Sequence, residues 1–397
     1  MPDFVRILPA EITGLIFSFV DHKALVNCER VSQAWRNAAL DNHLWRQVFQ
    51  KEHGPWQAAP GKDWKAMFAV NKDLRNKWKR AEMTYKYMDG HSDSVYCVQF
   101  DDVKAITGSR DRSLRVWDIT TGECLQTIEA ASGTAFHPLD SNTSIPPNLR
   151  HDGSILCLQY DPEILITGSS DGSCIVWSLP TFTTIARLSF HSAGVLDLCF
   201  DHSHIITCSR DMTVCVWDRS TFKLLRQLRG HTGPVNAIAL RENRIVSASG
   251  DSLVKMWDLE SGECIRDFKG HQRGLACVQF SEDMATIVSG GNDMDIRVWD
   301  AHTGECKNVL EGHRNLVRTL HLDARNRRIV SGSYDATVKV WNLDTGKLAL
   351  DIKHFHSTWV LAVKSDHKRL ISTSQDKLGL VIDFSEGVKG LEMLDEE

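Results

Sequence analysis

Apolar and polar residues alternate with a period of two over short stretches along most of this chain. In the segment from Gly312 to Asn342, for example, Val338 and Val340 flank Lys339, and the turn sequence Gly-Ser-Tyr-Asp precedes them. A period of two predicts β-strands, and the glycine supplies the backbone freedom that a tight turn needs. We therefore expect short strands joined by tight turns.

The pattern occurs seven times, at intervals of about forty residues. Each copy has a His, an Asp 20 or 22 residues later, and six residues after that a large apolar side chain. The His/Asp pairs are His91/Asp111, His151/Asp171, His191/Asp211, His231/Asp251, His271/Asp293, His313/Asp335 and His356/Asp376; the closing residues are Trp117, Trp177, Trp217, Trp257, Trp299, Trp341 and Ile382. A Ser or Thr stands four residues before every Asp: Thr107, Thr167, Thr207, Ser247, Ser289, Ser331 and Ser372.

A repeat of this length, with Gly-His near one end and Trp-Asp near the other, is typical of a β-propeller, whose blades bury their faces against each other. We predict a mainly β fold: a seven-bladed propeller at residues 83–384, preceded by a small all-α domain at 4–50 and a partly helical linker at 51–82. The final repeat lacks an outer strand and Thr84–Met88 has the form of one. This segment is predicted to complete the last blade and close the ring.

Ser/Thr, His and Asp recurring together also resemble a hydrolase triad. An enzyme needs one such site with an oxyanion hole beside it, whereas this chain has seven equivalent copies. The repetition favours a structural hydrogen-bond network that pins a loop of each blade to its turn and its Trp. We expect no catalytic residue.

The first fifty residues have helical periodicity. Pro9 fits the first turn of a helix, Asp21 the N-cap of a second and Ser32 that of a third. The first helix is apolar on two sides, and three short helices bury little surface by themselves, so one face is predicted to dock on another protein. The alternative is that the segment packs on the propeller.

The linker carries Trp64, Met67, Phe68, Leu74 and Trp78 at partly helical spacing. Such a helix is either a stiff spacer of about 25 Å or an ordinary amphipathic connector. Residues 129–150 form an insertion whose Ser, Asn and Pro content predicts a surface loop, and residues 385–397 are expected to be a solvated acidic tail.

Composition narrows the function classes. A net charge of −5 gives no general reason to expect nucleic acid, and no apolar run is long enough to span a bilayer. With no signal peptide, we expect a cytoplasmic or nuclear protein. The eleven cysteines include no C-x-x-C pair and several recur at repeat positions, so they predict small buried side chains; no metal site and no cofactor are expected.

Two positions of each repeat are predicted to surround the central channel on one face, because the repeat His and Asp must meet there. Five residues after each His stand Tyr96, Leu156, Leu196, Asn236, Ala276, Arg318 and Leu361; just before each Asp stand Arg110, Ser170, Arg210, Gly250, Asn292, Tyr334 and Gln375. None of these is acidic, three are Arg, and Arg273 adds a fourth. A cationic, hydrogen-bonding rim suits an anion, and phosphoserine peptides are the expected ligand class; the alternative is that arginine is merely frequent at exposed turns.

The N-terminal segment LPAEITGLIFSFVDHKALVNCERVSQAWRNAALDNHLWRQVF resembles an F-box along its whole length. The resemblance implies docking on a Skp-type adaptor and thereby on a cullin-RING ubiquitin ligase. We assign the docking surface to Leu8, Pro9, Ile12, Ile16, Phe19, Leu25 and Trp35.

The repeats resemble those of the β-TrCP (beta-transducin repeat-containing protein) family, as in VYCVQFDDVKAITGSRD at 95–111 and VLEGHRNLVRTLHLD at 309–323. That family binds a doubly phosphorylated Asp-Ser-Gly-x-x-Ser degron on the upper propeller face, and its ligand-contacting residue types match Tyr96, Arg110, Ser154, Ser170, Asn236, Arg273, Arg318 and Tyr334 here, to which the rim adds Arg210. Departures are Arg150 and Phe190 where a Gly precedes the His, and Ile382 in place of a Trp.

We expect a non-catalytic substrate receptor of a Skp-cullin-F-box ubiquitin ligase. It would capture phosphorylated proteins and direct them to ubiquitination and proteasomal degradation. Two alternatives stay open: a receptor of the cell-cycle-control type, which prefers phosphothreonine-proline ligands, and a plain assembly scaffold.

Overall fold

The computed structural model describes residues 3–53, 61–128, 150–179 and 181–394. Its contacts divide the chain into two compact units, residues 85–382 and residues 1–84 together with 383–397. The predicted insertion lies almost wholly outside the described residues. No helix within the described part of the chain is long and apolar enough to cross a bilayer.

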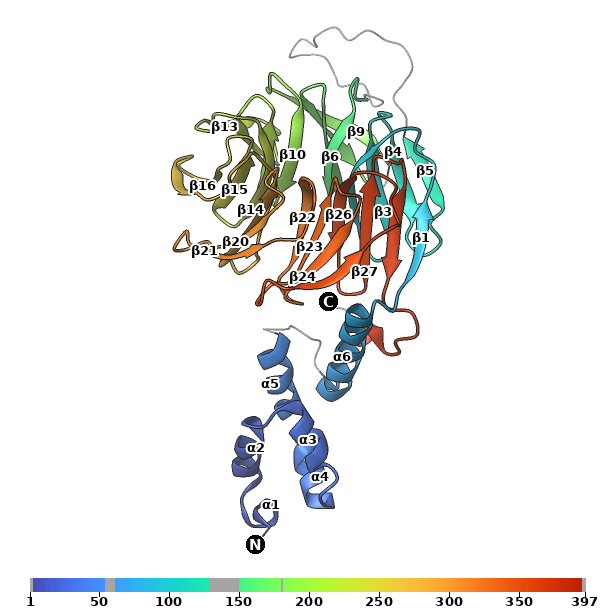
Figure 1. The fold of residues 1–397 in the computed structure, drawn as a ribbon, viewed down its shortest axis with the longest axis vertical. Coiled ribbons are helices and arrows are strands. Elements are labelled where there is room, and N and C mark those ends of the chain that lie inside the picture. Colours follow the sequence, from blue (N-terminus) through green and yellow to red (C-terminus); the bar gives the residue numbers. More distant parts are fainter. Residues whose placement is uncertain (1–2, 54–60, 129–149, 180, 395–397) are drawn as a thin grey trace. The chain divides into compact units, whose positions relative to one another are not determined.

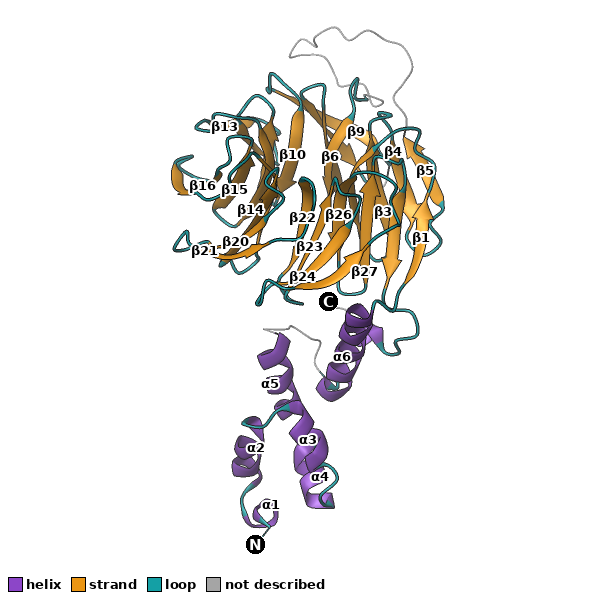
Figure 2. Ribbon diagram, in the orientation of Figure 1, coloured by secondary structure: helices purple, strands orange, loops and turns teal. Residues whose placement is uncertain are grey.

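Residues 85–382 form seven four-stranded antiparallel sheets, which confirms the predicted propeller (Figures 1 and 2). Blades 1 to 3 are β2 (Val95–Phe100), β3 (Lys104–Ser109), β4 (Leu114–Asp118) and β5 (Cys124–Ile128); β6 (Ile155–Tyr160), β7 (Ile164–Ser169), β8 (Ser173–Ser178) and β9 (Thr183–Ser189); and β10 (Val195–Phe200), β11 (His204–Ser209), β12 (Val214–Asp218) and β13 (Leu224–Leu228). Blades 4 and 5 are β14 (Val235–Arg241), β15 (Arg244–Ser249), β16 (Val254–Asp258) and β17 (Cys264–Phe268); and β18 (Leu275–Phe280), β19 (Thr286–Gly291), β20 (Ile296–Asp300) and β21 (Cys306–Leu310). Blade 6 is β22 (Val317–Asp323), β23 (Arg328–Ser333), β24 (Val338–Asn342) and β25 (Leu348–Ile352).

The seventh blade is built from both ends of the repeat region. Its three C-terminal strands are β26 (Val360–Ser365), β27 (Arg369–Ser374) and β28 (Gly379–Asp383), and β1 (Thr84–Met88) pairs with β28 as the fourth strand. Figure 1 shows light-blue β1 at the edge of this red sheet. The ring is therefore closed by backbone hydrogen bonds between segments almost 300 residues apart in the sequence.

The core lies between the blades. Inner strands such as β7 and β27 are buried on both faces, whereas outer strands such as β5 and β17 are mostly exposed. Each repeat tryptophan is 1 to 5% exposed and packs with apolar residues of the adjacent blade, as Trp257 does with Ile206 and Val216. One blade alone would leave this surface in water, which is why the repeat needs neighbours.

The repeat His, Asp and Ser/Thr form one network in every blade. His Nδ1 lies 2.6 to 3.1 Å from the Asp carboxylate, and His Nε2 lies 2.7 to 2.9 Å from the Ser/Thr hydroxyl. In six blades the Trp indole N–H donates to the same hydroxyl over 2.8 to 3.0 Å. A neutral imidazole with its proton on Nδ1 donates to the Asp carboxylate and accepts from the Ser/Thr hydroxyl, whose oxygen accepts the indole N–H where a Trp is present. Every donor and acceptor of the network is then satisfied. The recurring triad is a structural device.

This network predicts acid sensitivity. Burial alone would raise the pKa of the seven aspartates, but hydrogen bonds from the His and from neighbouring hydroxyl and backbone groups outweigh it, and the pKa of each is lowered. A carboxyl whose pKa is lower in the folded than in the unfolded chain stabilises the fold above about pH 4, the unfolded value, and this stability is lost progressively as the pH falls from there towards the lower folded pKa. We expect the melting temperature to change little between pH 7 and 5 and to fall steeply below pH 4. A flat profile down to pH 3 would contradict the assignment.

The other unit contains six α-helices among the described residues. They are α1 (Phe4–Ile7), α2 (Ala10–Ser18), α3 (His22–Cys28), α4 (Gln33–Ala39), α5 (Asn42–His53) and α6 (Trp64–Arg80). Asp21 and Ser32 cap α3 and α4 by accepting the N–H groups of Ala24 and Trp35. Sequence reasoning gave Leu44 and Trp45 no helix of their own; they lie buried in α5.

The linker helix is packed within this unit and is not an isolated spacer. Its stripe of Trp64 and Phe68 contacts Phe49 of α5, and Trp78 stacks on Phe384 with ring centroids 3.8 Å apart. The expectation of a solvated tail is also wrong for the described part of 385–397. Leu394 is 2% exposed, a short 3₁₀ helix covers Leu391–Met393, and Lys62 donates to the Met393 carbonyl over 3.1 Å. The apolar residues of the tail need burial, and α6 belongs to the unit that provides it.

Candidate functional site

Two loops of each blade lie side by side on one face of the propeller. In every blade the backbone N–H of the residue before the repeat Asp donates to the carbonyl of the residue three positions after the repeat His. The seven pairs are Arg110 and Ser94, Ser170 and Ser154, Arg210 and Gly194, Gly250 and Pro234, Asn292 and Gly274, Tyr334 and Leu316, and Gln375 and Trp359, at 2.8 to 3.0 Å. The residues just before each Asp therefore lie beside the loop that follows each His. The residues five positions after each His come two positions after the bonded carbonyl, so both sets belong to one face, which we call the rim.

A β-bulge aims the second set into the channel. In the first strand of each blade the pairing skips one residue, always the one five positions after the His; β2, for example, shifts register between Val95 and Cys97, leaving Tyr96 unpaired. All seven of these residues line a central cavity of about 640 Å³. A bulge re-aims a side chain without ending the strand, so the fold presents Tyr96, Asn236 and Arg318 to the same space.

The predicted arginines are accessible. Arg110 is 58% exposed and its Nε lies 3.8 Å from the Asp93 carboxylate. Arg210 and Arg273 are exposed and Arg318 is half-buried; within the described residues these three guanidinium groups have no hydrogen-bond or ion-pair partner. Guanidinium groups that are not already paired can give two parallel hydrogen bonds to a phosphate.

The neutral site residues divide into rim donors and structural clasps. Ser170 Oγ accepts the Ser154 backbone N–H over 2.9 Å. This bond uses a lone pair of the Ser170 oxygen, so the Ser170 hydroxyl can still donate its proton to a ligand. The amide of Asn236 instead donates to the Leu275 carbonyl of the next blade over 2.6 Å. Gln99 and Gln159 similarly accept backbone N–H groups of the blades that follow them. Much of the polar lining therefore holds neighbouring blades together.

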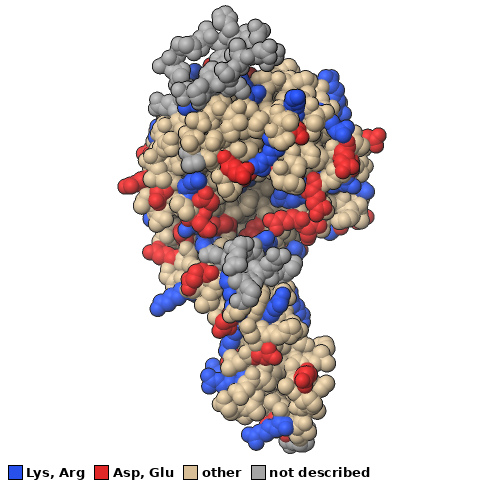
Figure 3. Space-filling view, turned by 180° about the vertical axis from the view of Figure 1, so that it is seen from behind, with Lys and Arg blue, Asp and Glu red and all other residues tan. Residues whose placement is uncertain are grey.

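Sequence reasoning missed two rim residues. Trp359 is 42% exposed and stacks on Tyr334, with centroids 4.2 Å apart and planes 7° apart. Asp93, whose side chain is 43% exposed, stands two positions after His91 and makes the rim less uniformly cationic than expected. The position two or three residues after each His was the available signal, and only Ser154 and Arg273 had been taken from it. Figure 3 likewise shows both charge signs interspersed over the propeller surface in that view.

The helical unit exposes an apolar surface around α2. Ile12, Ile16 and Phe19 are 45, 38 and 79% exposed, Pro9 is exposed and Leu8 is half-buried. Leu25 is fully buried, so its assignment to the docking surface was wrong: it is a core residue. Trp35 is half-buried among Phe4 and Phe17 and donates to Asp3 over 2.8 Å, so its contacts are mainly internal. Ile7 and Leu15, 64 and 56% exposed, extend the surface.

Comparison with family models matches both units. A model described as F-box-like matches residues 5–51, and one described as WD domain, G-beta repeat matches residues 82–118, 147–178, 182–218, 222–258, 262–300 and 304–342. The repeats alone cover more than half of the chain. The chain is an F-box/WD-repeat protein. The last repeat, which has Ile382 instead of a Trp, lies outside the matched ranges.

Curated relatives of this F-box/WD-repeat protein agree over about a third of its length. A probable E3 ubiquitin ligase complex SCF subunit, sconB of Arthroderma otae, is 29% identical over 32% of this chain and 24% of its own. F-box/WD repeat-containing protein 7 of Drosophila melanogaster is 30% identical over 33% of this chain and 11% of its own, and F-box and WD repeat domain-containing 11-A of Danio rerio is 32% identical over 33% and 29%. The matched region is thus between about a tenth and three tenths of each relative's length. The WD40 propeller of Doa1, at TM-score 0.66 and 24% identity over 77% of this chain and 98% of its own, supports the fold.

Proposed function

We propose that this protein is the substrate-recognition subunit of a Skp-cullin-F-box ubiquitin ligase and binds phosphorylated degrons on the propeller rim. The observation that carries the proposal is the placement of Arg110, Arg210, Arg273 and Arg318 on the loops and strand starts of one face, with Arg318 lining the central cavity, in a chain of net charge −5. Local positive charge on a net acidic protein favours a specific anion over polyanions in general. The names of the curated relatives support the ligase assignment.

The chemistry of ubiquitin transfer would take place on other subunits. The receptor contributes proximity, because holding an acceptor lysine near activated ubiquitin makes a bimolecular encounter effectively local. This role requires the protein to bind an adaptor and a substrate at the same time. It requires no nucleophile, and burial raises the pKa of the Cys97, Cys157 and Cys277 thiols, consistent with core side chains.

Titration calorimetry tests the ligand class. We expect a peptide with two phosphoserines in an Asp-Ser-Gly-x-x-Ser frame to bind, and its unphosphorylated form to bind at least about 100-fold more weakly, since two doubly charged groups are lost. Affinity should fall as salt is raised. Equal affinities for both forms would rule the proposal out.

The same titration separates the second candidate. A receptor of the cell-cycle-control type, the alternative left open by the sequence, would prefer a phosphothreonine-proline peptide. Preference for that peptide over the phosphoserine frame would decide in its favour. Binding of neither would leave the scaffold role.

Adaptor docking is tested on the exposed apolar surface. We expect Phe19→Asp to abolish co-purification with a Skp-type adaptor, because Phe19 is 79% exposed and a buried charge there would be unpaired in the complex. The matched control is Val103→Asp, a 70% exposed residue of the propeller, which should leave capture unchanged. Unaltered capture by the Phe19 variant would place the docking surface elsewhere.

A further inference from the structure

Asp93 interrupts the positive charge of the rim. The rim takes its residues from four positions of each repeat: two, three and five residues after the His, and one before the Asp. Across the seven blades Asp93 is the only acidic residue at these positions. The position two residues after the His holds Asp93, Gly153, Ala193, Gly233, Arg273, Asn315 and Thr358, so blades 1 and 5 carry opposite charges at equivalent places.

The Asp93 side chain is held in place by its neighbours. Its Oδ1 accepts the Ser94 backbone N–H over 2.7 Å and the Ser94 hydroxyl over 3.3 Å, and its carbonyl oxygen accepts the Ser109 hydroxyl over 3.1 Å. Ser94 is 4% exposed, so these hydrogen bonds are formed at the edge of the core. The position of the Asp93 charge is therefore fixed by the loop itself.

The second carboxylate oxygen of Asp93, Oδ2, lies 3.8 Å from Arg110 Nε. Both side chains are exposed, so the pair contributes little to the stability of the fold. The other charged residues of this turn leave the pair as it is, because Asp111 is bonded within the repeat network and Arg112 forms no ion pair with a described residue. Arg110 therefore faces a carboxylate whose place is set in advance.

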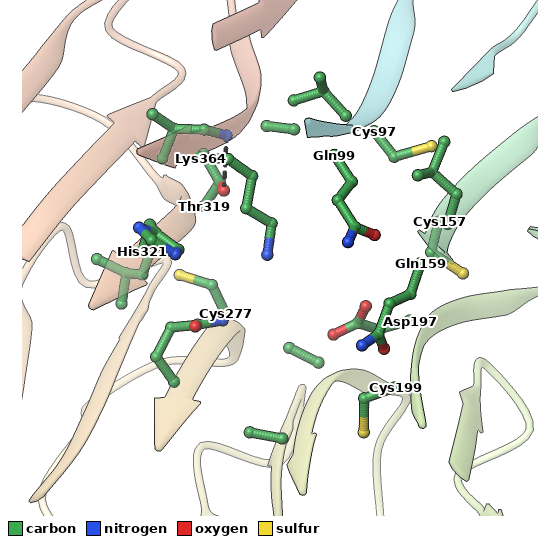
Figure 4. Close-up of a pocket in the computed structure, with 18 of the residues that line it drawn as sticks. Cys97, Gln99, Cys157, Gln159, Asp197, Cys199, Cys277, Thr319, His321 and Lys364 are labelled. Atoms are coloured by element: carbon green, nitrogen blue, oxygen red, sulfur yellow. Dashed lines mark hydrogen bonds between the residues drawn. The ribbon is translucent and has the colours of Figure 1, made fainter. Parts of the chain in front are cut away.

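The carboxylate inside the central cavity has a different role. Figure 4 shows Asp197 pointing into this cavity from blade 3, and its two oxygens accept the backbone N–H groups of Leu198 and Ile238 at 2.9 and 3.0 Å. Asp197 thus joins blades 3 and 4. Asp93, in contrast, faces a guanidinium that the proposed function assigns to the ligand.

The charge balance differs between two parts of the rim. Arg110 lies beside a fixed carboxylate, whereas Arg210, Arg273 and Arg318 have no hydrogen-bond or ion-pair partner among the described residues. A phosphoserine carries close to two negative charges at pH 7. On Arg110 it would lie within one Debye length of Asp93, about 8 Å at physiological salt, so repulsion from Asp93 would offset much of the attraction to Arg110. A neutral or basic residue meets no such repulsion.

We propose that Asp93 is a specificity-determining residue that keeps phosphate out of the Arg110 part of the rim. This inference rests on the proposed function and narrows its ligand class. The ligand is a degron with one required phosphate, bound in the part of the rim that carries Arg210, Arg273 and Arg318, and with a neutral or basic residue beside Asp93. A second phosphate adds little affinity.

Titration calorimetry compares four forms of one Asp-Ser-Gly-x-x-Ser peptide: unphosphorylated, phosphorylated at either serine, and phosphorylated at both. We expect wild type to bind one singly phosphorylated form within about three-fold of the doubly phosphorylated form, and the other at least about 30-fold more weakly. Equal losses on removing either phosphate would overturn the inference and leave the proposed function intact. If no phosphorylated form binds better than the unphosphorylated one, both are overturned.

Asp93→Asn removes the charge and keeps an amide oxygen that can accept the Ser94 N–H. We expect this variant to bind the doubly phosphorylated peptide about five- to ten-fold more tightly than wild type, and to lose that gain when the second phosphate is absent. Asp344→Asn is the matched control, because Asp344 is 50% exposed, is likewise ion-paired with an arginine and lies on the turn between β24 and β25. Its affinity should stay within about two-fold of wild type. An unchanged affinity of Asp93→Asn would overturn the inference.

A double-mutant cycle assigns the effect to Arg110. In wild type, Arg110→Ala should weaken binding of the doubly phosphorylated peptide less than about three-fold, because Asp93 already compensates Arg110. In the Asp93→Asn background the same change should weaken binding about five-fold or more, since Arg110 can then bind the second phosphate. A loss of about 30-fold or more for Arg110→Ala in wild type would contradict the inference.

Charge and fold are separated in the same variants. Replacing the serine whose phosphate is dispensable by Lys should improve binding to wild type about three-fold relative to Ala, and should not improve binding to Asp93→Asn. The melting temperature of Asp93→Asn should stay within about 2 °C of wild type, because an exposed ion pair contributes little. A lower melting temperature together with weaker binding of every peptide would mean that Asp93 supports the fold, and would overturn its assignment to specificity.

Discussion

Arg318→Ala is expected to weaken phosphopeptide binding by about 2 to 3 kcal/mol, roughly 30- to 150-fold. Arg318 is the bulge residue of blade 6, and its two chain neighbours, Val317 and Thr319, are both paired with β23, which fixes its backbone. Its guanidinium has no hydrogen-bond or ion-pair partner among the described residues. A preorganised, unpaired arginine gives its full hydrogen-bonding capacity to a phosphate. Calorimetry with the phosphoserine peptide measures the loss.

Arg226→Ala provides the matched control. Arg226 is exposed on the outer strand β13, so its removal changes the net charge by the same amount far from the rim and should alter affinity less than two-fold. The melting temperature of Arg318→Ala should stay close to that of wild type, because no hydrogen bond or ion pair to a described residue is lost. An Arg318→Ala protein that binds the peptide as tightly as wild type would remove Arg318 from the site.

Asp335→Ala is expected to lower the free energy of unfolding by about 3 kcal/mol. The Asp335 carboxylate accepts from His313 Nδ1 at 2.8 Å, from the backbone N–H groups of Arg314 and Thr337 at 2.9 and 3.0 Å, and from the Thr337 hydroxyl at 2.6 Å. Its removal leaves several buried donors unsatisfied at once. Chemical denaturation followed by tryptophan fluorescence measures the effect.

Two comparisons test this explanation. Asp344→Ala breaks the ion pair with Arg327, whose two side chains are 50 and 47% exposed, and should cost less than about 1 kcal/mol. Asp376→Ala should cost less than Asp335→Ala, because Ile382 gives the seventh blade no indole N–H and its network is shorter. Equal losses for Asp335 and Asp344 would mean that the network does not stabilise the fold in the way proposed.

The sequence by itself determined the propeller, because its information is local and repeated. The period of two defines the strands, and the spacing of His, Ser/Thr, Asp and Trp recurs in every blade because each network closes within one blade. A ring of such blades also requires the outer strand that Thr84–Met88 supplies. The rim arginines could be predicted for the same reason, since their distance from the repeat His or Asp fixes their place in the blade.

Only the tertiary structure decided which residues are exposed, paired or buried by segments distant in the sequence. Leu25 and Ile16 look alike in the sequence, yet one is fully buried and the other 38% exposed. Leu394 is buried with residues more than 300 positions earlier in the chain, which no local pattern signals. Asn236 and Asp197 hydrogen-bond to backbone groups of the next blade, because adjacent inner strands of different blades set which donors and acceptors meet. Which donors and acceptors pair between blades depends on the geometry of the closed ring. The sequence of one repeat does not contain that geometry.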